Sequence, residues 1–147
     1  MKFSIEQMQE FVKFYENELF SQIKINFSME KDWTAQFPEK AGIYAIFDKE
    51  KFIYVGETSQ LRERMKDIRR TVNHTFRRKL GKLLDENEII EKYKFSSSFE
   101  GKLNEYCKLN ITVSYLEVNF GRLEIESFII RNNKPILNSI EKRGVIK

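Results

Sequence analysis

Two tyrosines in neighbouring apolar runs have side chains that could take part in hydrolytic chemistry. Tyr44 ends "GIY", residues 42–44, and Tyr54 begins "YVG", residues 54–56. A phenol can position a water molecule and, with help from a nearby cation, accept its proton, although a free phenol titrates at about pH 10. The plainer interpretation is structural, because tyrosine is an ordinary strand residue with a polar tip.

An arginine-rich segment directly follows the second tyrosine. Residues 62–82 carry nine Lys or Arg and two acidic residues, a net charge of 9 − 2 = +7, so the rest of this +4 chain sums to 4 − 7 = −3. Such asymmetry predicts a surface for a polyanion, usually nucleic acid. The alternative is a basic helix face whose charges are simply solvated. The residues expected to contact a nucleic-acid backbone are Arg62, Arg69, Arg70, Arg77, Arg78 and Lys79.

The composition excludes several kinds of site. A single cysteine, Cys107, excludes an internal disulfide and a cysteine zinc cluster, and a single histidine, His74, excludes a metal site built on several histidines. The chain has no apolar run of about 18 residues, and its N-terminus is amphipathic rather than a charged leader followed by an apolar block. We therefore expect no membrane span and no secretory signal, and a cytoplasmic location.

The elements that must position these residues follow from hydrophobic periodicity. Strands are expected over residues 42–47, 51–56 and 111–118. Helices are expected over residues 4–20, from a cap at Thr58 or Ser59, after "NHT" at 73–75, briefly within 96–110, and over 122–132. Ser4 and Gln7 should form a capping box on the first helix. This order predicts an α+β domain with a small, mostly antiparallel sheet.

The first two strands are expected to form a hairpin through "DKE", residues 48–50. With a three-residue turn, Phe47 faces Lys51, and counting back places Tyr44 opposite Tyr54 on one face of the sheet. The two helices that follow should bury their apolar stripes, which are Leu61, Met65, Ile68 and Val72 in the first, and Phe76, Leu80, Leu83 and Leu84 in the second.

Taken in order, these motifs resemble those of the GIY-YIG nucleases over about residues 41–138. "GIY" and "YVG" match the two triads of the family, and Arg64 lies eight residues after the last glycine. "ESFIIRNNKPILN", residues 126–138, matches the family's late glutamate, proline and asparagine. The resemblance implies a three-stranded antiparallel sheet flanked by helices, and metal-dependent hydrolysis of DNA phosphodiester bonds.

The resemblance also implies roles for individual residues. Tyr44, Tyr54, Arg64 and Glu126 are the functional positions, with Arg64 on the scissile phosphate and Glu126 as the protein ligand of one Mg²⁺ or Mn²⁺. Asn138 matches the family's asparagine and is assigned to DNA binding.

Glu126 has a helical environment that supports this role. Its neighbours at helical spacing are Leu123, Ile129 and Ile130, and a carboxylate among aliphatic side chains is costly unless a cation compensates it. Arg122, one turn earlier, is the alternative partner for that charge.

The chain departs from the family pattern at two positions. Glu57 stands where many members have lysine, and Ile68 stands where many have histidine. His74, six residues further on, is a candidate for the missing histidine. The positive end of a helix dipole would keep it neutral and able to accept a proton. The alternative is a capping or surface histidine.

We expect residues 1–40 to form a helical extension packed on a nuclease domain at 41–147. The leading hypothesis is a metal-dependent endonuclease that acts on double-stranded DNA. The alternatives are a catalytically silent nucleic-acid-binding domain of the same fold and a basic protein–protein module. The residues leave open the cleavage specificity, the biological role and the oligomeric state, a homodimer included.

Overall fold

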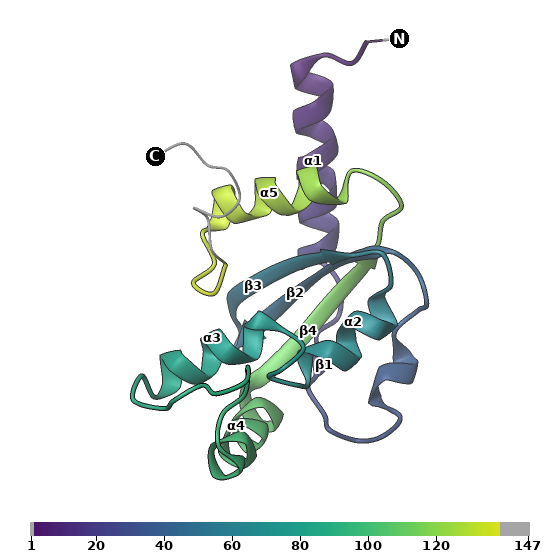
Figure 1. Ribbon diagram of the computed structural model, residues 1–147. Coiled ribbons are helices and arrows are strands. Elements are labelled where there is room, and N and C mark those ends of the chain that lie inside the picture. Colours follow the sequence, from purple (N-terminus) through teal and green to yellow (C-terminus); the bar gives the residue numbers. More distant parts are fainter. Residues whose placement is uncertain (1, 139–147) are drawn as a thin grey trace.

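The computed structural model describes residues 2–138, which fold around a four-stranded antiparallel sheet (Figure 1). The strands, in the order β1-β4-β2-β3, are β1 (Ile25–Asn26), β4 (Ile111–Glu117), β2 (Gly42–Asp48) and β3 (Lys51–Thr58). The predicted α+β class is confirmed, but the prediction of three strands is wrong, because β1 adds an edge beside β4. Two residues are too few to show the alternation by which a strand is recognised in a sequence.

Helices cover both faces of the sheet (Figure 1). One face carries α1 (Ile5–Phe20) and α5 (Arg122–Asn133). The other carries α2 (Leu61–Ile68), α3 (Thr75–Leu84) and α4 (Ser97–Asn110), with the short 3-10 helix η1 (Trp33–Gln36) against α2. The predicted last helix is therefore confirmed to within a residue, whereas α4 is a full helix rather than a brief one.

The central strand β2 separates two hydrophobic cores. Its residues from Gly42 to Phe47 are all buried, as expected for a strand that is covered on both faces. Alternate side chains point to opposite faces. Ile43 and Ala45 pack with α1 and α5, while Tyr44 and Ile46 pack with the helices of the other layer. The register of β2 therefore decides which chemistry faces which helix layer.

The β2–β3 hairpin differs from the expected one in its turn and its register. The turn is tight, with Lys49 and Glu50 both at positive φ (50° and 70°), so Asp48 pairs with Lys51. A bulge then follows, and Tyr44 pairs with Gly56 while Ile46 pairs with Tyr54. The predicted Tyr44–Tyr54 pair is therefore wrong, because Lys49 and Glu50 form a two-residue turn although neither is Gly or Asn, the residues that such turns favour.

Several helix boundaries also differ from the prediction. The capping box of Ser4 and Gln7 is confirmed on α1. Helix α2, however, is capped by Gln60 rather than Thr58 or Ser59, because β3 continues through Thr58. The predicted stripes are too long, since Val72 lies beyond the end of α2 and is exposed, as are Leu83 and Leu84 at the end of α3.

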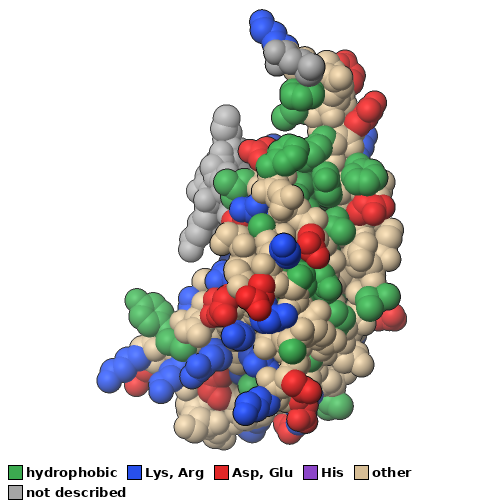
Figure 2. Space-filling model, turned by 90° about the vertical axis from the view of Figure 1, so that its right-hand side faces the viewer, with side chains coloured by type: hydrophobic (Ala, Val, Ile, Leu, Met, Phe, Trp, Pro, Cys, Tyr) green, Lys and Arg blue, Asp and Glu red, His purple; other side chains and the backbone are tan. Residues whose placement is uncertain are grey.

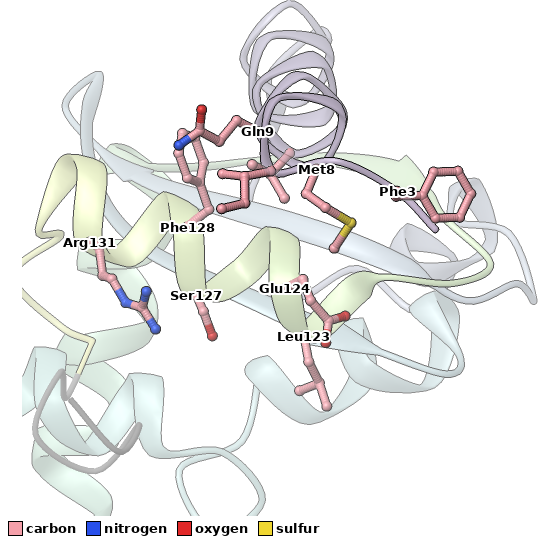
Figure 3. Close-up of a pocket in the computed structure, with 10 residues that line it drawn as sticks. Phe3, Met8, Gln9, Leu123, Glu124, Ser127, Phe128 and Arg131 are labelled. Carbon is pink, nitrogen blue, oxygen red and sulfur yellow. The ribbon is translucent and has the colours of Figure 1, made fainter. Parts of the chain in front are cut away.

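The N-terminal part of the chain contributes both to the sheet and to a groove. Residues 25–26 of the expected extension form β1. Helix α1 packs on the sheet and on α5 through Val12 and Leu19, whereas Ile5 and Met8 in its first turns are exposed. A groove of about 480 Å³ runs between α1 and α5 (Figure 3). No helix within residues 2–138 is long and apolar enough to cross a membrane.

Candidate active site

Tyr44 is completely buried on the face of the sheet covered by α2 and α3. Its ring lies across Gly56, the residue that pairs with it in β3, and a Cβ added at Gly56 would overlap the Tyr44 hydroxyl. Gly56 is therefore required by Tyr44, because any larger residue at position 56 would displace the phenol.

The bulge in β3 brings Tyr54 to the same face as Tyr44. After the tight turn, a regular ladder would have paired Tyr54 with Ala45 on the opposite face, but the extra residue restores the alternation. The ring centroids of the two tyrosines lie 6.2 Å apart. Tyr54 also lies 5.5 Å from the ring of His74, so the three rings form one cluster.

His74 is the N-cap of α3 and contacts Tyr44 directly. Its Nδ1 accepts the backbone N–H of Phe76 at 2.9 Å, and its Nε2 lies 2.8 Å from the Tyr44 hydroxyl oxygen. Burial lowers the pKa of His74 to about 3, and the charges of Arg64, Arg78 and Lys79 act in the same direction. The ring is therefore neutral near pH 7, as the sequence predicts, with burial as the largest cause.

The cap hydrogen bond also determines the tautomer of His74. A neutral imidazole has one N–H and one acceptor nitrogen, and Nδ1 is the acceptor here. The proton must then lie on Nε2, which donates to the Tyr44 hydroxyl oxygen. The expectation that His74 accepts a proton does not fit this geometry, because the nitrogen that faces the cluster is a donor.

Arg64 supplies a second donor to Tyr44. Its Nε lies 3.4 Å from the hydroxyl oxygen, and its Nη1 lies 3.5 Å from a carboxylate oxygen of Asp67. Burial raises the pKa of Tyr44 the most, Tyr54 raises it further and Arg64 lowers it. Because the net shift of the pKa is upward, the phenol stays protonated. Asp67 was not identified from the sequence, although its spacing of three residues from Arg64 on a helix is a recognisable pairing signal.

Glu126 comes from the other helix layer. Its carboxylate is buried (6% exposed), and Ile125, Ile129 and Ile130 around it belong to the core shared with β2. Leu123, by contrast, is 55% exposed, so the expected aliphatic surroundings hold on one side only.

Arg122 connects α5, the helix that carries Glu126, to Glu57 on β3. Its Nε donates to the Glu57 carboxylate at 3.2 Å, so the expected alternative partner of Glu126 has a carboxylate of its own. Arg122 and Glu126 are four residues apart and lie on one stripe of α5. Helix α5 therefore packs against β3, the strand that carries Gly56 and Tyr54.

Glu126 fits a magnesium-type ion that is held by few protein ligands. A buried carboxylate is an oxygen ligand of the kind that Mg²⁺ takes, and a cation offsets the cost of its burial. Within the part of the chain that the structure describes, no three His, Cys, Asp or Glu side chains gather where they could hold a metal. The remaining ligands would then be water and substrate oxygens.

Most of the basic residues after β3 contact the protein itself. Arg62 pairs with Glu39 and donates to the Phe37 carbonyl, while Arg69 donates to the carbonyls of Ser28 and Glu30. These two arginines fasten the segment before β2 onto α2. Arg78 donates to the carbonyls of Thr71 and Val72. Lys79 donates to the Leu137 carbonyl. Lys82 donates to the carbonyls of Glu86 and Glu88.

Two members of the expected DNA-binding set have structural roles instead. Arg77 is 1% exposed and forms an ion pair with Glu100 at 2.9 Å, so its guanidinium cannot lie on a surface phosphate. The side-chain amide of Asn138 pairs with both the N–H and the C=O of Val55 at 2.9 Å, beside the Leu137 N–H that donates to the Ile53 carbonyl. Leu137 and Asn138 together thereby cover the edge of β3 on both sides of Tyr54.

Comparison with known proteins places the chain in a family. Residues 24–147 match the family described as GIY-YIG catalytic domain. The chain matches no curated protein. Similar solved structures include the N-terminal endonuclease domain of UvrC from Thermotoga maritima, bound to magnesium (16% identity, TM-score 0.43, covering 76% of this chain and 100% of that one). They also include a mutant of EndoII from bacteriophage T4 (14% identity, TM-score 0.44, covering 90% and 98%). The chain therefore belongs to the GIY-YIG family of catalytic domains, whose members are nucleases, and its enzyme class is that of a phosphodiester hydrolase.

Proposed function

We propose that this nuclease is a DNA endonuclease that needs a divalent cation and reacts at Tyr44, Tyr54, Arg64 and Glu126. The observation that carries the proposal is the convergence of His74 and Arg64 on the hydroxyl oxygen of the buried Tyr44, within a matched catalytic domain. A phenol that accepts two such hydrogen bonds is arranged for a change in charge, since plain packing would need neither donor.

Tyr44 is the group that holds the attacking water in this proposal. Its oxygen accepts from His74 Nε2–H and Arg64 Nε–H, so its own proton is directed elsewhere. If that proton leaves, both donors stabilise the phenolate and offset part of the cost of burial. Tyr54, whose ring lies 6.2 Å away, borders the same space and positions the substrate.

Arg64 binds the scissile phosphate. Its guanidinium is half-buried and is held by Tyr44 through Nε and by Asp67 through Nη1. The remaining N–H groups of the fork are the donors for phosphate oxygens. A permanently charged donor at this point stabilises the charge that develops in the transition state.

Glu126, with water and substrate oxygens, would hold Mg²⁺ or Mn²⁺, and the ion would neutralise charge on the reacting phosphate. With one carboxylate, the free protein should bind the ion weakly, and DNA should strengthen the binding. We further propose double-stranded DNA as the substrate, since the exposed basic side chains of the chain suit a duplex backbone, and the cytoplasm as the setting of the reaction.

The test is a metal titration of supercoiled-plasmid nicking, with a chelator control, for the parent and two matched variants. Glu126→Gln should retain the fold and DNA binding but lose cleavage, because it removes the charged ligand without changing the shape. Glu124→Gln should cut like the parent. Glu124 also lies on α5, but it is exposed and lines the groove between α1 and α5 (Figure 3). Cleavage by Glu126→Gln at the parental rate would remove Glu126 from the reaction, and parental cleavage in excess chelator would remove the metal.

A further inference from the structure

Three basic side chains that make no internal ion pair converge on one pocket. Within residues 2–138, Arg70, Lys92 and Lys94 are exposed and form no ion pair or hydrogen bond through their side chains, unlike most cations of the 62–82 segment. All three line a pocket of about 460 Å³, which we call the Arg70–Lys92–Lys94 pocket. Arg70 follows α2, whereas the two lysines come from the loop before α4, so only the fold brings them together.

The loop that carries the lysines has a strained, well-defined shape. Lys92 and Tyr93 both have positive φ (51° and 66°), a conformation that residues other than glycine seldom adopt twice in succession. Two backbone hydrogen bonds between Glu91 and Lys94, of 2.9 and 3.1 Å, close this turn. The Arg78 guanidinium lies 5.5 Å from the centre of the Tyr93 ring and braces it. The turn therefore presents Lys92 and Lys94 from a fixed backbone.

The pocket is strongly positive. Five cations line it, namely Arg69, Arg70, Arg77, Lys92 and Lys94, against one carboxylate, Glu100, which gives 5 − 1 = +4. Glu100 is already engaged, because its oxygens accept from Arg77, from the Thr71 hydroxyl and from the Phe95 N–H. Among the described residues, the buried Nη1 of Arg77 has no hydrogen-bond partner. The carboxylate therefore does not neutralise the exposed cations at the rim.

The pocket adjoins the candidate active site along the chain. Thr71 and Val72 line it, and His74, two residues later, contacts the Tyr44 hydroxyl. One strand of duplex DNA offers a phosphate about every 3.4 Å of helix axis. A strand whose scissile phosphate lies at Arg64 therefore carries further phosphates past the neighbouring surface. Exposed lysine and arginine side chains at a rim suit such a backbone better than a small enclosed anion.

We propose that the Arg70–Lys92–Lys94 pocket binds a backbone phosphate of the DNA substrate outside the scissile bond, an inference that rests on the proposed function. The pocket sets where the duplex lies relative to Tyr44 and Arg64. It contributes through charge, so its effect depends on salt. Arg77 and Glu100 form its internal support and do not touch the DNA.

The test compares Arg70→Gln/Lys92→Gln/Lys94→Gln with a control triple variant, Lys13→Gln/Lys51→Gln/Lys134→Gln, which removes the same charge from exposed lysines elsewhere. Binding of a short duplex is measured over a range of salt concentrations, beside plasmid nicking by the parent. The pocket variant should bind roughly three- to tenfold more weakly at moderate salt. Its plot of log affinity against log salt should be shallower, by about 0.9 for each phosphate that the variant no longer neutralises. The control should keep the parental slope.

The outcomes separate this inference from the proposed function. If the parent nicks plasmid and the pocket variant keeps the parental affinity and slope, the pocket does not bind DNA, and the nuclease assignment stands. If the parent neither binds nor cuts DNA, the proposed function fails, and this inference fails with it.

A thermal-shift measurement with inorganic phosphate at constant ionic strength completes the test. Stabilisation of the parent by phosphate with no effect of the variant on DNA binding would mark a free-anion site. Lys92→Gln/Lys94→Gln repeats the measurement without altering the end of α2.

Discussion

At the scale of single residues, the Tyr44 oxygen is where the candidate site's hydrogen bonds meet. Two donors from different helices, Arg64 on α2 and His74 at the start of α3, reach it from separate directions. Burial and Tyr54 oppose ionisation of the phenol by raising its pKa, and Arg64 favours ionisation. A hydrogen bond donated by His74 would also favour the phenolate. The site therefore holds a neutral phenol whose oxygen already has the hydrogen bonds that a phenolate would need.

The donor role of His74 can be separated from its capping role by two substitutions. His74→Gln can place an amide N–H near the position of Nε2, so it should retain much of the cleavage rate. It would lose the cap and should cost about 1 kcal/mol of stability. His74→Asn can cap α3 through its side-chain oxygen but is too short to reach Tyr44, so it should fold stably and cleave poorly. The measurements are plasmid nicking and thermal unfolding of both variants.

A general-base role for His74 would give a different pattern. Neither glutamine nor asparagine can accept a proton near neutral pH, so a base would make both variants inactive to the same degree. Equal loss of cleavage in two folded variants would therefore contradict the tautomer inferred from the Phe76 hydrogen bond.

At the scale of elements, the hairpin and its bulge aim the two tyrosines. The tight turn alone would direct Tyr54 away from Tyr44, and the bulge corrects this. Leu137 and Asn138 then pair with the edge of β3 on either side of Tyr54. Edge strands are usually the loosest part of a sheet, so this pairing holds Tyr54 where β3 has no neighbouring strand.

Gly56→Ala tests how closely the hairpin positions the phenol. The added methyl group would overlap the Tyr44 hydroxyl, so the ring must move away from Arg64 and His74. Cleavage should fall by a factor on the order of 10², the effect of misplacing a reacting group by about 1 Å. Gly101→Ala in α4 is the matched control, because a Cβ there meets no atom within 4 Å. It should cleave normally and gain up to about 1 kcal/mol of helix stability. Normal cleavage by Gly56→Ala would show that Tyr44 needs no fixed position.

At the scale of the whole molecule, the basic side chains are unevenly distributed over the surface. On the face shown in Figure 2, Lys and Arg side chains gather over the lower half, at the height of α2, α3 and α4 in Figure 1. Hydrophobic side chains are more frequent in the upper half, at the height of α1 and α5. The half with the basic surface is also the half that holds Tyr44, Arg64 and His74. A polyanionic substrate is thereby attracted to the side on which the candidate site lies.

The buried His74 should make the fold sensitive to acid. Its pKa is lowered to about 3 in the folded chain, whereas an unfolded histidine titrates at about 6.5. Between these values the unfolded chain binds a proton that the folded chain excludes, so the free energy of unfolding should fall as the pH drops from about 6.5 towards 3. Urea unfolding of the parent and His74→Asn at pH 7 and pH 5 measures this effect. The parent should lose more stability than the variant, and equal losses would mean that His74 is not excluded from water.

The sequence by itself determined the α+β class, the principal helices and strands, and the motif residues Tyr44, Tyr54, Arg64 and Glu126. Apolar periodicity and fixed spacing are local properties that can be read along the chain. The sequence also predicted a neutral His74, in agreement with its lowered pKa. The single carboxylate as metal ligand stays a prediction. Local spacing could not specify the register of β2 on β3, because Lys49 and Glu50 are not the residues that normally form so tight a turn.

Only the tertiary structure decided which charges are available at the surface. Nine basic residues within 62–82 look equivalent in the sequence, yet packing buries Arg77 on Glu100 and directs Arg62, Arg69 and Arg78 to carbonyl groups. Lys92 and Lys94, outside that segment, join Arg70 only through the path of the loop before α4. Whether a charge is paired depends on groups that are distant along the chain, and residue spacing carries no information about such contacts.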